Sequence, residues 1–240
     1  MPKILGVQID AVTPRAAYER CQSWLLESST ITGPKVVFTP NPEIITYATK
    51  HPEFKSVLAQ ADLAIPDGIG VVWLARPKLP ERVTGTDLMI ELLALAEKAN
   101  LGVGFVLRQQ GLSNKTQLAA ALKLRWPNLK YQIIYHEETF ALNESTQPLK
   151  LICVALGCPE QEQWCNAQRH GYLSSARVLL TVGGGVDFLT GQFLRAPSFF
   201  RKLGLEWLWR LFVQPQRWRR ILTAIIIFPW YVWTKSNKES

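Results

Sequence analysis

The chain has 240 residues, and its 27 Lys and Arg against 19 Asp and Glu give a formal charge of +8. Hydrophobic residues make up 48% and charged residues 19%, which excludes a disordered chain and fits one large domain, alone or with an appendage. Four cysteines without a Cys-x-x-Cys pair or a zinc-ligand histidine indicate neither a structural zinc site nor a disulfide framework.

Short β-branched runs alternate with longer segments of helical periodicity, which predicts an α/β fold with a Rossmann-like, largely parallel sheet flanked by helices. The strands are expected at residues 3–9, 35–39, 62–65, 102–107, 130–135, 150–156 and 177–182. Helices are expected between them. Two begin at the capping residues Thr13 and Thr84, and a third runs from Ser113 to Trp126 and ends before Pro127.

The charge and the tryptophans gather near the C-terminus. Residues 195–240 hold nine Lys or Arg against two acidic residues, a net charge of +7, so the first 194 residues carry only +1. Five of the nine Trp lie in the same segment. We therefore expect a domain of residues 1–194 and a basic, Trp-rich helical appendage of residues 195–240 that meets an anionic surface.

Within this appendage, Ile221 to Trp233 contains no charged residue and is interrupted by Pro229. Thirteen residues are too few to span a bilayer, which needs about 20. The segment either docks into the protein core or a subunit interface, or lies in a membrane interface. The flanking arginines, Arg217, Arg219 and Arg220, favour the membrane interface, because a core helix has no need of them.

Two motifs with polar side chains follow the second and third predicted strands. Thr39-Pro-Asn-Pro-Glu43 places Asn41 at a strand end, where open α/β sheets bind ligands, although an Asn before Pro is also a common helix cap. Ile65-Pro-Asp-Gly-Ile-Gly70 presents Asp67, an acceptor suited to act as general base toward a hydroxyl group. The alternative is a Pro-Asp-Gly turn without chemistry.

Two further motifs follow the last two predicted strands. Gly157-Cys-Pro-Glu-Gln-Glu162 reads as a helix start that projects Gln161, and we expect Cys158 to be unreactive because no histidine is placed to activate it. Thr181-Val-Gly-Gly-Gly-Val-Asp187 could bring backbone N–H groups to a diphosphate, and a bare tight turn is nearly as plausible.

All four motifs follow strands, so in a parallel sheet they gather at one edge. This predicts a single ligand cleft that contains Asn41, Asp67, Gln161 and the loop of Gly183, Gly184 and Gly185. The chain has no Asp-x-Asp motif and no clustered His, Asp and Glu ligands, so neither an obligatory divalent ion nor another cofactor is expected.

In order and spacing these motifs resemble the WecG/TagA/CpsF family of bacterial glycosyltransferases. The resemblance extends through Arg82-Val-Thr-Gly-Thr-Asp87, Val182-Gly-Gly-Gly-Val-Asp-Phe188, Arg195-Ala-Pro197 and the run from Gly204 to Leu211, and covers most of residues 35–220. It implies metal-independent, inverting transfer of an N-acetylmannosamine-type sugar from a uridine-diphosphate (UDP) donor to a polyprenyl-diphosphate-linked sugar at the cytoplasmic face of the cell membrane, in cell-surface polysaccharide synthesis.

The resemblance also implies roles for particular residues. Asp67 matches the catalytic base, Thr39 and Asn41 match residues on the acceptor side, and the loop of Gly183, Gly184 and Gly185 with Asp187 matches the donor-nucleotide pocket. Further substrate contacts are implied for Arg82, Gln161, Arg210, Arg217 and Arg220, the last three on an appendage that closes over the site and meets the lipid diphosphate.

The chain departs from the family pattern in two loops. It reads Leu107-Arg-Gln-Gln-Gly111 and Tyr135-His-Glu-Glu138 where the family usually has glycine-rich or His-Gly-Tyr runs that shape the donor pocket. The choice of donor sugar is therefore open. Arg108 could pair with a donor carboxylate, but a solvated loop arginine is the expected role.

Two other functions are weighed against the transferase. A non-catalytic nucleotide-binding regulatory protein at the membrane surface would use the same cleft without needing Asp67. A nucleic-acid-binding module would use the basic appendage, but its apolar run suits lipid better than a phosphate backbone, so no nucleic acid is expected. We expect a peripheral protein on the inner face of the cell membrane, with no secretory signal in its first ten residues; a homo-oligomer is compatible with the sequence.

Overall fold

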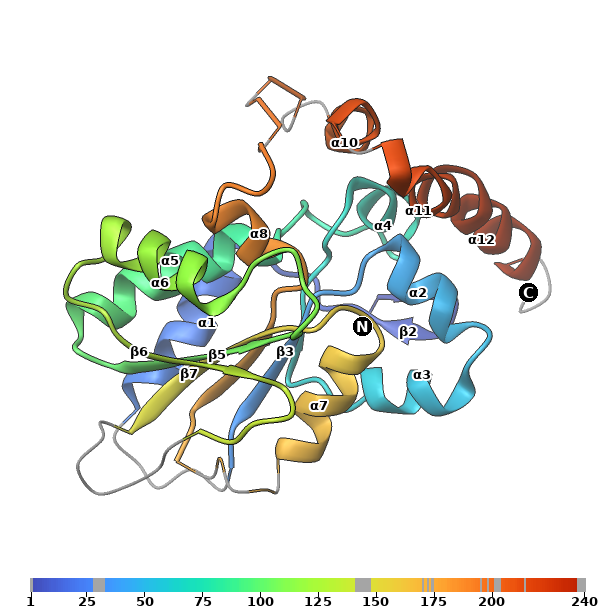
Figure 1. Cartoon of the computed structure of the whole chain (residues 1–240). Coiled ribbons are helices and arrows are strands. Elements are labelled where there is room, and N and C mark those ends of the chain that lie inside the picture. The colour runs from blue at the N-terminus through green and yellow to red at the C-terminus, as the bar shows by residue number, and fades with distance from the viewer. Residues whose placement is uncertain are drawn as a thin grey trace.

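The computed structural model describes residues 2–27, 33–140, 148–169, 171, 173, 175–194, 196–197, 199–200, 204–213 and 215–236 (Figure 1). Within these ranges the side chains of Glu206, Arg210, Arg217 and Ser236 lie outside the description.

A six-stranded sheet forms the centre of the molecule. Its strands lie in the order β4 (Leu63–Ala64), β3 (Lys35–Phe38), β8 (Val178–Thr181), β7 (Leu149–Ala155), β5 (Gly102–Leu107) and β6 (Lys130–Tyr135). Every neighbouring pair is parallel. The prediction of a parallel sheet flanked by helices is therefore confirmed, and the loops after all six strands leave from one edge.

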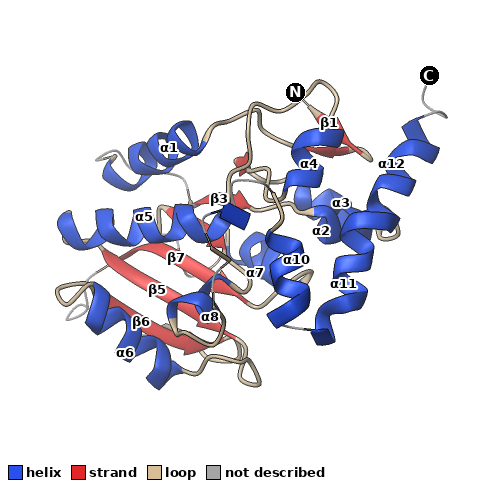
Figure 2. Ribbon diagram, turned by 90° about the horizontal axis from the view of Figure 1, so that it is seen from above, coloured by secondary structure: helices blue, strands red, loops and turns tan. Residues whose placement is uncertain are grey.

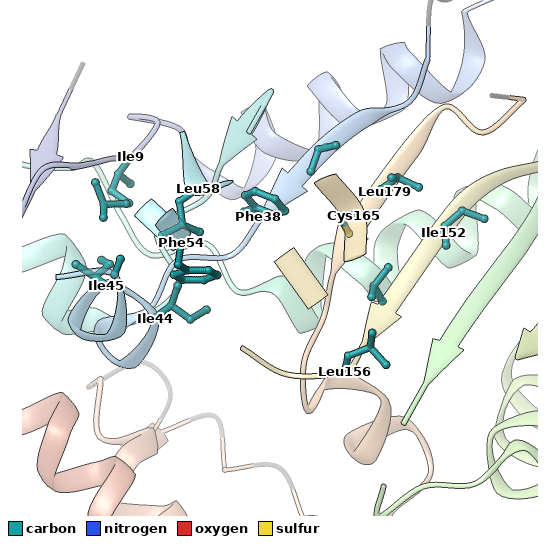
Figure 3. Packing of buried hydrophobic residues seen from close by; sticks show 14 of the residues in the cluster. Ile9, Phe38, Ile44, Ile45, Phe54, Leu58, Ile152, Leu156, Cys165 and Leu179 are labelled. Atoms are coloured by element: carbon teal, nitrogen blue, oxygen red, sulfur yellow. The ribbon is translucent and has the colours of Figure 1, made fainter. Parts of the chain in front are cut away.

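Helices cover both faces of this sheet, because successive strand residues point to opposite sides. On one face, Val37 of β3 packs with residues of α1 (Pro14–Leu26), α5 (Gly85–Lys98) and α6 (Lys115–Arg125). On the other face, Val36 and Phe38 pack with residues of α2 (Pro42–Ala48), α3 (Pro52–Leu58) and α7 (Glu160–Gln168), as Figure 3 shows for Phe38, Ile44 and other residues of this cluster. The two layers bury the central strands, and the edge strand β6 stays partly exposed.

Two helices begin where their capping residues predict, and a third begins two residues later than predicted. Thr13 and Thr84 accept hydrogen bonds from the backbone N–H groups of Ala16 and Asp87, at the starts of α1 and α5. The third predicted helix, α6, begins at Lys115, two residues later than the predicted start at Ser113, because Asn114 caps it in a capping box. Side-chain caps of this kind satisfy N–H groups that have no partner inside the helix, which explains why the first two starts were readable.

The first predicted strand is wrong in part. Residues 3–9 do not join the central sheet but form a separate antiparallel hairpin of β1 (Lys3–Ile4) and β2 (Val7–Gln8). The chain reverses at Leu5 and Gly6, which both have positive φ, a conformation that Gly adopts at little cost. The β-branched residues still serve as core, since Ile4, Val7 and Ile9 are buried beside α3.

The C-terminal segment is helical and lies along one side of the molecule, next to α2 and α4 (Ile69–Leu74) (Figures 1 and 2). It consists of α10 (Glu206–Val213), a 3₁₀ turn (Pro215–Arg217), α11 (Trp218–Leu222), a π-helical turn (Thr223–Ile227) and α12 (Phe228–Ser236). Pro229 does not interrupt the helix. The preceding π turn, in which the Phe228 N–H donates to the Thr223 carbonyl, accommodates the proline.

This C-terminal helix docks on the body and exposes its other face. Phe228 is completely buried in the same core cluster as Ile44 and Val71, whereas Trp230 and Trp233 are 58% and 64% exposed. The expectation that the apolar run docks into the protein core therefore holds for Phe228, and contact of the exposed residues with a membrane interface stays a prediction. The division of the chain near residue 194 stays a prediction.

Candidate active site

The loops after five adjacent strands line one cleft. These strands are β4, β3, β8, β7 and β5, and the cleft at their carboxyl ends has a volume of about 620 Å³. We call it the polar cleft; its lining includes Thr39, Asn41, Glu43, Asp67, Thr86, Arg108, Ser113, Gly157, Cys158, Gln161, Gly183, Gly184, Gly185, Asp187, Phe188 and Arg220. The predicted convergence of Asn41, Asp67, Gln161 and the glycine loop on one crevice is therefore confirmed.

A second cavity of about 400 Å³ adjoins the first. We call it the apolar cleft. It lies between α4 and the C-terminal helices, and its lining includes Ile69, Trp73, Leu74, Trp207, Ile221, Ala224, Ile225 and Pro229. The two cavities share five residues, which are Asn41, Glu43, Asp67, Thr86 and Phe188. Any two ligands that occupy both clefts would meet at this shared wall.

Asp67 lies on the shared wall at the end of β4. Its backbone N–H donates to the Pro40 carbonyl at 3.1 Å, and its Oδ2 accepts from the Gly85 N–H at 3.5 Å. The next residue, Gly68, has φ of 129° and a position where a β-carbon would lie 3.1 Å from the Pro42 ring. Only glycine fits this close approach, so the Pro-Asp-Gly turn holds the carboxyl group in place.

Thr39 and Asn41 join the end of β3 to α2. Thr39 is buried, and its hydroxyl lies 3.4 Å from that of Thr181. Asn41 caps α2 by accepting the Ile44 N–H at 3.0 Å, which is the structural role that the sequence left open. Asn41 also lines both clefts, so capping does not remove it from the site.

Gln161 ties two of the loops together. Its Oε1 accepts from the N–H groups of Gly157 and Gly183, at 3.2 and 3.1 Å. Its Nε2 donates to Glu162, a buried residue whose importance the sequence analysis missed. The sequence carried no signal for this burial, because an acidic residue in the first turn of a helix usually faces solvent.

The glycine loop contributes less to anion binding than its composition suggests. The N–H of Gly183 donates to Gln161, and that of Gly185 donates to the Val182 carbonyl at 2.8 Å. The following helix, α8 (Gly185–Leu189), has only five residues. Asp187 accepts from the Ser113 hydroxyl at 2.7 Å and so links the loop to the start of α6. Binding of a diphosphate by this loop stays a prediction, centred on Gly184.

The basic residues of the site occupy different places. Arg82 lines the apolar cleft near Asp67 and does not line the polar cleft. Arg220 lines the polar cleft, where its Nε lies 2.5 Å from Glu43 Oε2. Arg108 donates to the Leu156 carbonyl at 2.7 Å and pairs with Glu160 at 2.6 Å, so an internal carboxylate already holds it. The side chains of Arg210 and Arg217 lie outside the described residues.

Cys158 borders the polar cleft, but its thiol is poorly suited to attack. Burial raises the pKa of Cys158 far above its usual value, and the nearby Glu162 carboxyl adds to this effect. The expectation of an unreactive cysteine agrees with this environment.

Among the residues that the structure describes, no group of three or more His, Cys, Asp or Glu is arranged to hold a metal ion. Within the same residues, no helix combines the length and apolarity that crossing a bilayer requires.

Comparison with known proteins identifies the family. The model of the family described as "Glycosyl transferase WecG/TagA/CpsF family" matches residues 2–240. A protein of Staphylococcus aureus (strain NCTC 8325 / PS 47) named N-acetylglucosaminyldiphosphoundecaprenol N-acetyl-beta-D-mannosaminyltransferase is 34% identical over 239 residues, which covers 94% of this chain and 89% of the relative. The protein of the same name from strain MRSA252 is 33% identical over the same shares.

These relatives are named as enzymes, so the alternative of a non-catalytic regulatory protein is not favoured. The resemblance seen in the sequence is confirmed: the chain belongs to the WecG/TagA/CpsF family and is a glycosyltransferase.

Proposed function

We propose that this chain transfers an N-acetylmannosamine-type sugar from a UDP-sugar to a sugar carried on polyprenyl diphosphate, with inversion at the anomeric carbon. The observation that carries the proposal is the position of Asp67 on the wall shared by a polar and an apolar cleft. The names of the Staphylococcus aureus relatives support the acceptor and the transferred sugar.

In the proposed reaction Asp67 is the general base. Its carboxylate takes the proton of an acceptor hydroxyl, and the hydroxyl oxygen forms a bond to the anomeric carbon of the donor. The bond from that carbon to the diphosphate breaks on the opposite face, and UDP leaves with the electron pair. A placed base contributes on the order of 100-fold to 10,000-fold to such a rate.

The polar cleft is assigned to the donor. Its volume of about 620 Å³ falls within the range of small-molecule sites, and polar groups from five loops line it. The diphosphate is placed between the Gly184 region and Arg220, whose charge would stabilise the leaving group. Arg210 and Arg217 are proposed to meet the lipid diphosphate. The lack of an Asp-x-Asp motif supports reaction without an obligatory metal.

The apolar cleft is assigned to the lipid end of the acceptor. Side chains of Ile69, Ile221 and Ile225 line it, and it opens between α4 and the C-terminal helices. A polyprenyl chain that enters here would bring its diphosphate and first sugar to the shared wall, beside Asp67. Arg82, on the same side of Asp67, is placed to meet the acceptor rather than the nucleotide.

The exposed face of the C-terminal helices is proposed to rest on the inner face of the cell membrane. Exposed apolar side chains there are Phe212, Trp218, Leu222, Ile225, Ile226, Trp230 and Trp233. Arg219 and Lys235 lie on the same helices, and each basic residue near an anionic surface adds about 1 kcal/mol of attraction. Trp and basic residues beside an apolar face are typical of interfacial helices.

A donor screen tests the proposal. UDP-sugars are offered one at a time with a short-chain polyprenyl-diphosphate sugar, with and without EDTA, and release of UDP is followed. We expect release that depends on the acceptor, survives EDTA and is fastest with an N-acetylmannosamine-type donor. No acceptor-dependent release from any donor would count against the proposed function.

A further inference from the structure

Glu162 is a buried carboxyl group that the proposed reaction does not use. It lies in α7, is 0% exposed, and has its pKa raised to about 7 by burial. Its Oε1 accepts from Gln161 Nε2 at 2.7 Å, whereas its Oε2 has no hydrogen-bond partner among the described residues. Burying a carboxyl group with one oxygen unpaired is unfavourable, so the role of this group lies elsewhere than in stability.

Gln161 connects this carboxyl group to the polar cleft. The Oε1 of Gln161 accepts from the N–H of Gly157, which follows β7, and from the N–H of Gly183, which follows β8. These strands are neighbours in the sheet. A single amide oxygen therefore holds together two loops that line the polar cleft.

Hydrogen bonds to both its oxygen and its nitrogen fix the orientation of the Gln161 amide. A glutamine amide can be turned so that either its oxygen or its nitrogen faces the loops. Backbone N–H groups only donate, so Gly157 and Gly183 require the oxygen. An ionised carboxyl group only accepts, and a protonated one keeps a carbonyl oxygen that accepts, so in either state Glu162 can take its hydrogen bond from the amide nitrogen. The two requirements agree, and reversal of the amide would break all three hydrogen bonds.

We propose that Glu162 is a positioning residue, which fixes the Gln161 amide and thereby sets the spacing of the Gly157 and Gly183 loops around the donor diphosphate. This inference rests on the proposed function, because that proposal assigns the polar cleft to the donor. Glu162 itself does not line the cleft. Its loss should therefore act on donor binding and orientation through Gln161, and not on proton transfer by Asp67.

Two substitutions separate the hydrogen bond from the charge. Glu162→Met removes the acceptor but keeps an unbranched side chain of similar length, and we expect it to lower kcat/KM for the donor by about 10-fold to 100-fold, mainly through KM. Glu162→Gln keeps an acceptor oxygen without the charge, and we expect its donor KM to stay near that of the wild type. Cys165→Ala is the matched control, since Cys165 is buried in the same helix and lines neither cleft.

A double-mutant cycle tests whether Glu162 acts through Gln161. If it does, the variant with both Gln161→Met and Glu162→Met is no worse than Gln161→Met alone. Losses that multiply would overturn the proposal. A loss of about 10-fold or more in kcat/KM for the donor in Glu162→Gln, at a melting temperature no lower than that of the wild type, would also overturn it. This outcome is readable even where Glu162→Met does not fold.

Hydrogen exchange provides a readout that needs no turnover. In peptides that contain Gly157 and Gly183, we expect faster amide exchange in Glu162→Met and no change in Glu162→Gln. Equal protection in all three proteins would contradict the positioning role. A wild-type protein that releases no UDP would contradict the proposed function while leaving this comparison of the loops intact, so the two failures are distinguishable.

Discussion

The polar and apolar clefts share a wall but are built in different ways. The polar cleft is formed mainly by loops at the ends of five strands, with Arg220 of the C-terminal helices also lining it, and hydrogen bonds such as those of Gln161 and Asn41 hold its groups. The apolar cleft is closed by the C-terminal helices, which contribute Ile221, Ala224 and Ile225. In the proposed reaction, the sheet edge thus determines which donor binds, while the C-terminal helices determine how a lipid approaches.

The largest expected effect is at the shared wall. Asp67→Asn should lower kcat by about 100-fold to 10,000-fold, because the amide cannot take the acceptor proton. The affinity for UDP, measured by calorimetry, should stay near that of the wild type. Glu53→Gln is the control, because Glu53 is an exposed carboxylate outside both clefts. If Asp67→Asn lost UDP binding as well as turnover, Asp67 would be a donor-binding residue of the polar cleft and not the general base.

The buried carboxyl group of Glu162 should make the stability of the protein depend on pH. Burial raises the pKa of Glu162 from 4.5 to about 7, so between these values the folded chain holds a proton that the unfolded chain releases. The free energy of unfolding therefore falls as the pH rises through this window, by up to about 3 kcal/mol. Glu162→Gln cannot titrate, so its stability advantage over the wild type should grow from pH 4.5 to 7. Denaturant unfolding of both proteins at pH 4.5 and pH 7 measures this advantage. An equal difference in the free energy of unfolding at the two pH values would contradict the raised pKa of Glu162.

A bulky side chain in the apolar cleft should affect only the acceptor. Ala224→Trp narrows that cleft, and we expect the KM of a long-chain polyprenyl acceptor to rise about 10-fold through lost apolar contact. The donor KM should not change, because Ala224 does not line the polar cleft. If both KM values rise together, the two cavities do not serve separate substrates.

The exposed face of the C-terminal helices should affect membrane binding. The rings of Trp230 and Trp233 lie 5.8 Å apart and are exposed. Changing both to Ala should reduce partitioning onto anionic vesicles by roughly 10-fold, as measured by flotation. Leu124→Ala is the control, since Leu124 is exposed on α6 and lies outside the C-terminal helices. A similar loss in this control would show that general apolarity drives flotation.

The smallest effect is expected from the pair of Glu43 and Arg220. Both side chains are partly exposed, so Glu43→Gln should change the free energy of unfolding by less than about 1 kcal/mol. It should nevertheless strengthen UDP binding a few-fold, roughly 3-fold, because Arg220 becomes available to an anion. Arg220→Gln should weaken UDP binding. Equal UDP affinities in all three proteins would remove Arg220 from the donor site.

Much of the polar cleft was predictable because each of its motifs directly follows a β-branched run. A parallel sheet brings such strand ends to one edge, so Asn41, Asp67 and Gln161 could be placed together without coordinates. The caps at Thr13 and Thr84 were readable for a similar reason, since their hydrogen bonds are local in sequence.

Features that depend on long-range packing were not predictable. The burial of Glu162 depends on how α7 sits on the sheet, and an acidic residue in a first helical turn usually faces solvent. The docking of Phe228 beside Ile44 joins segments almost two hundred residues apart, and one apolar run cannot reveal which residues face the core. At the N-terminus, the turn at Leu5 and Gly6 overrode the strand propensity of its neighbours.

The most direct test of the central claim is the structure of the protein with UDP bound. The account predicts the nucleotide in the polar cleft, its diphosphate between the Gly184 region and Arg220, and Asp67 facing the terminal phosphate with the apolar cleft left open. UDP in the apolar cleft, or a diphosphate remote from Asp67, would contradict it.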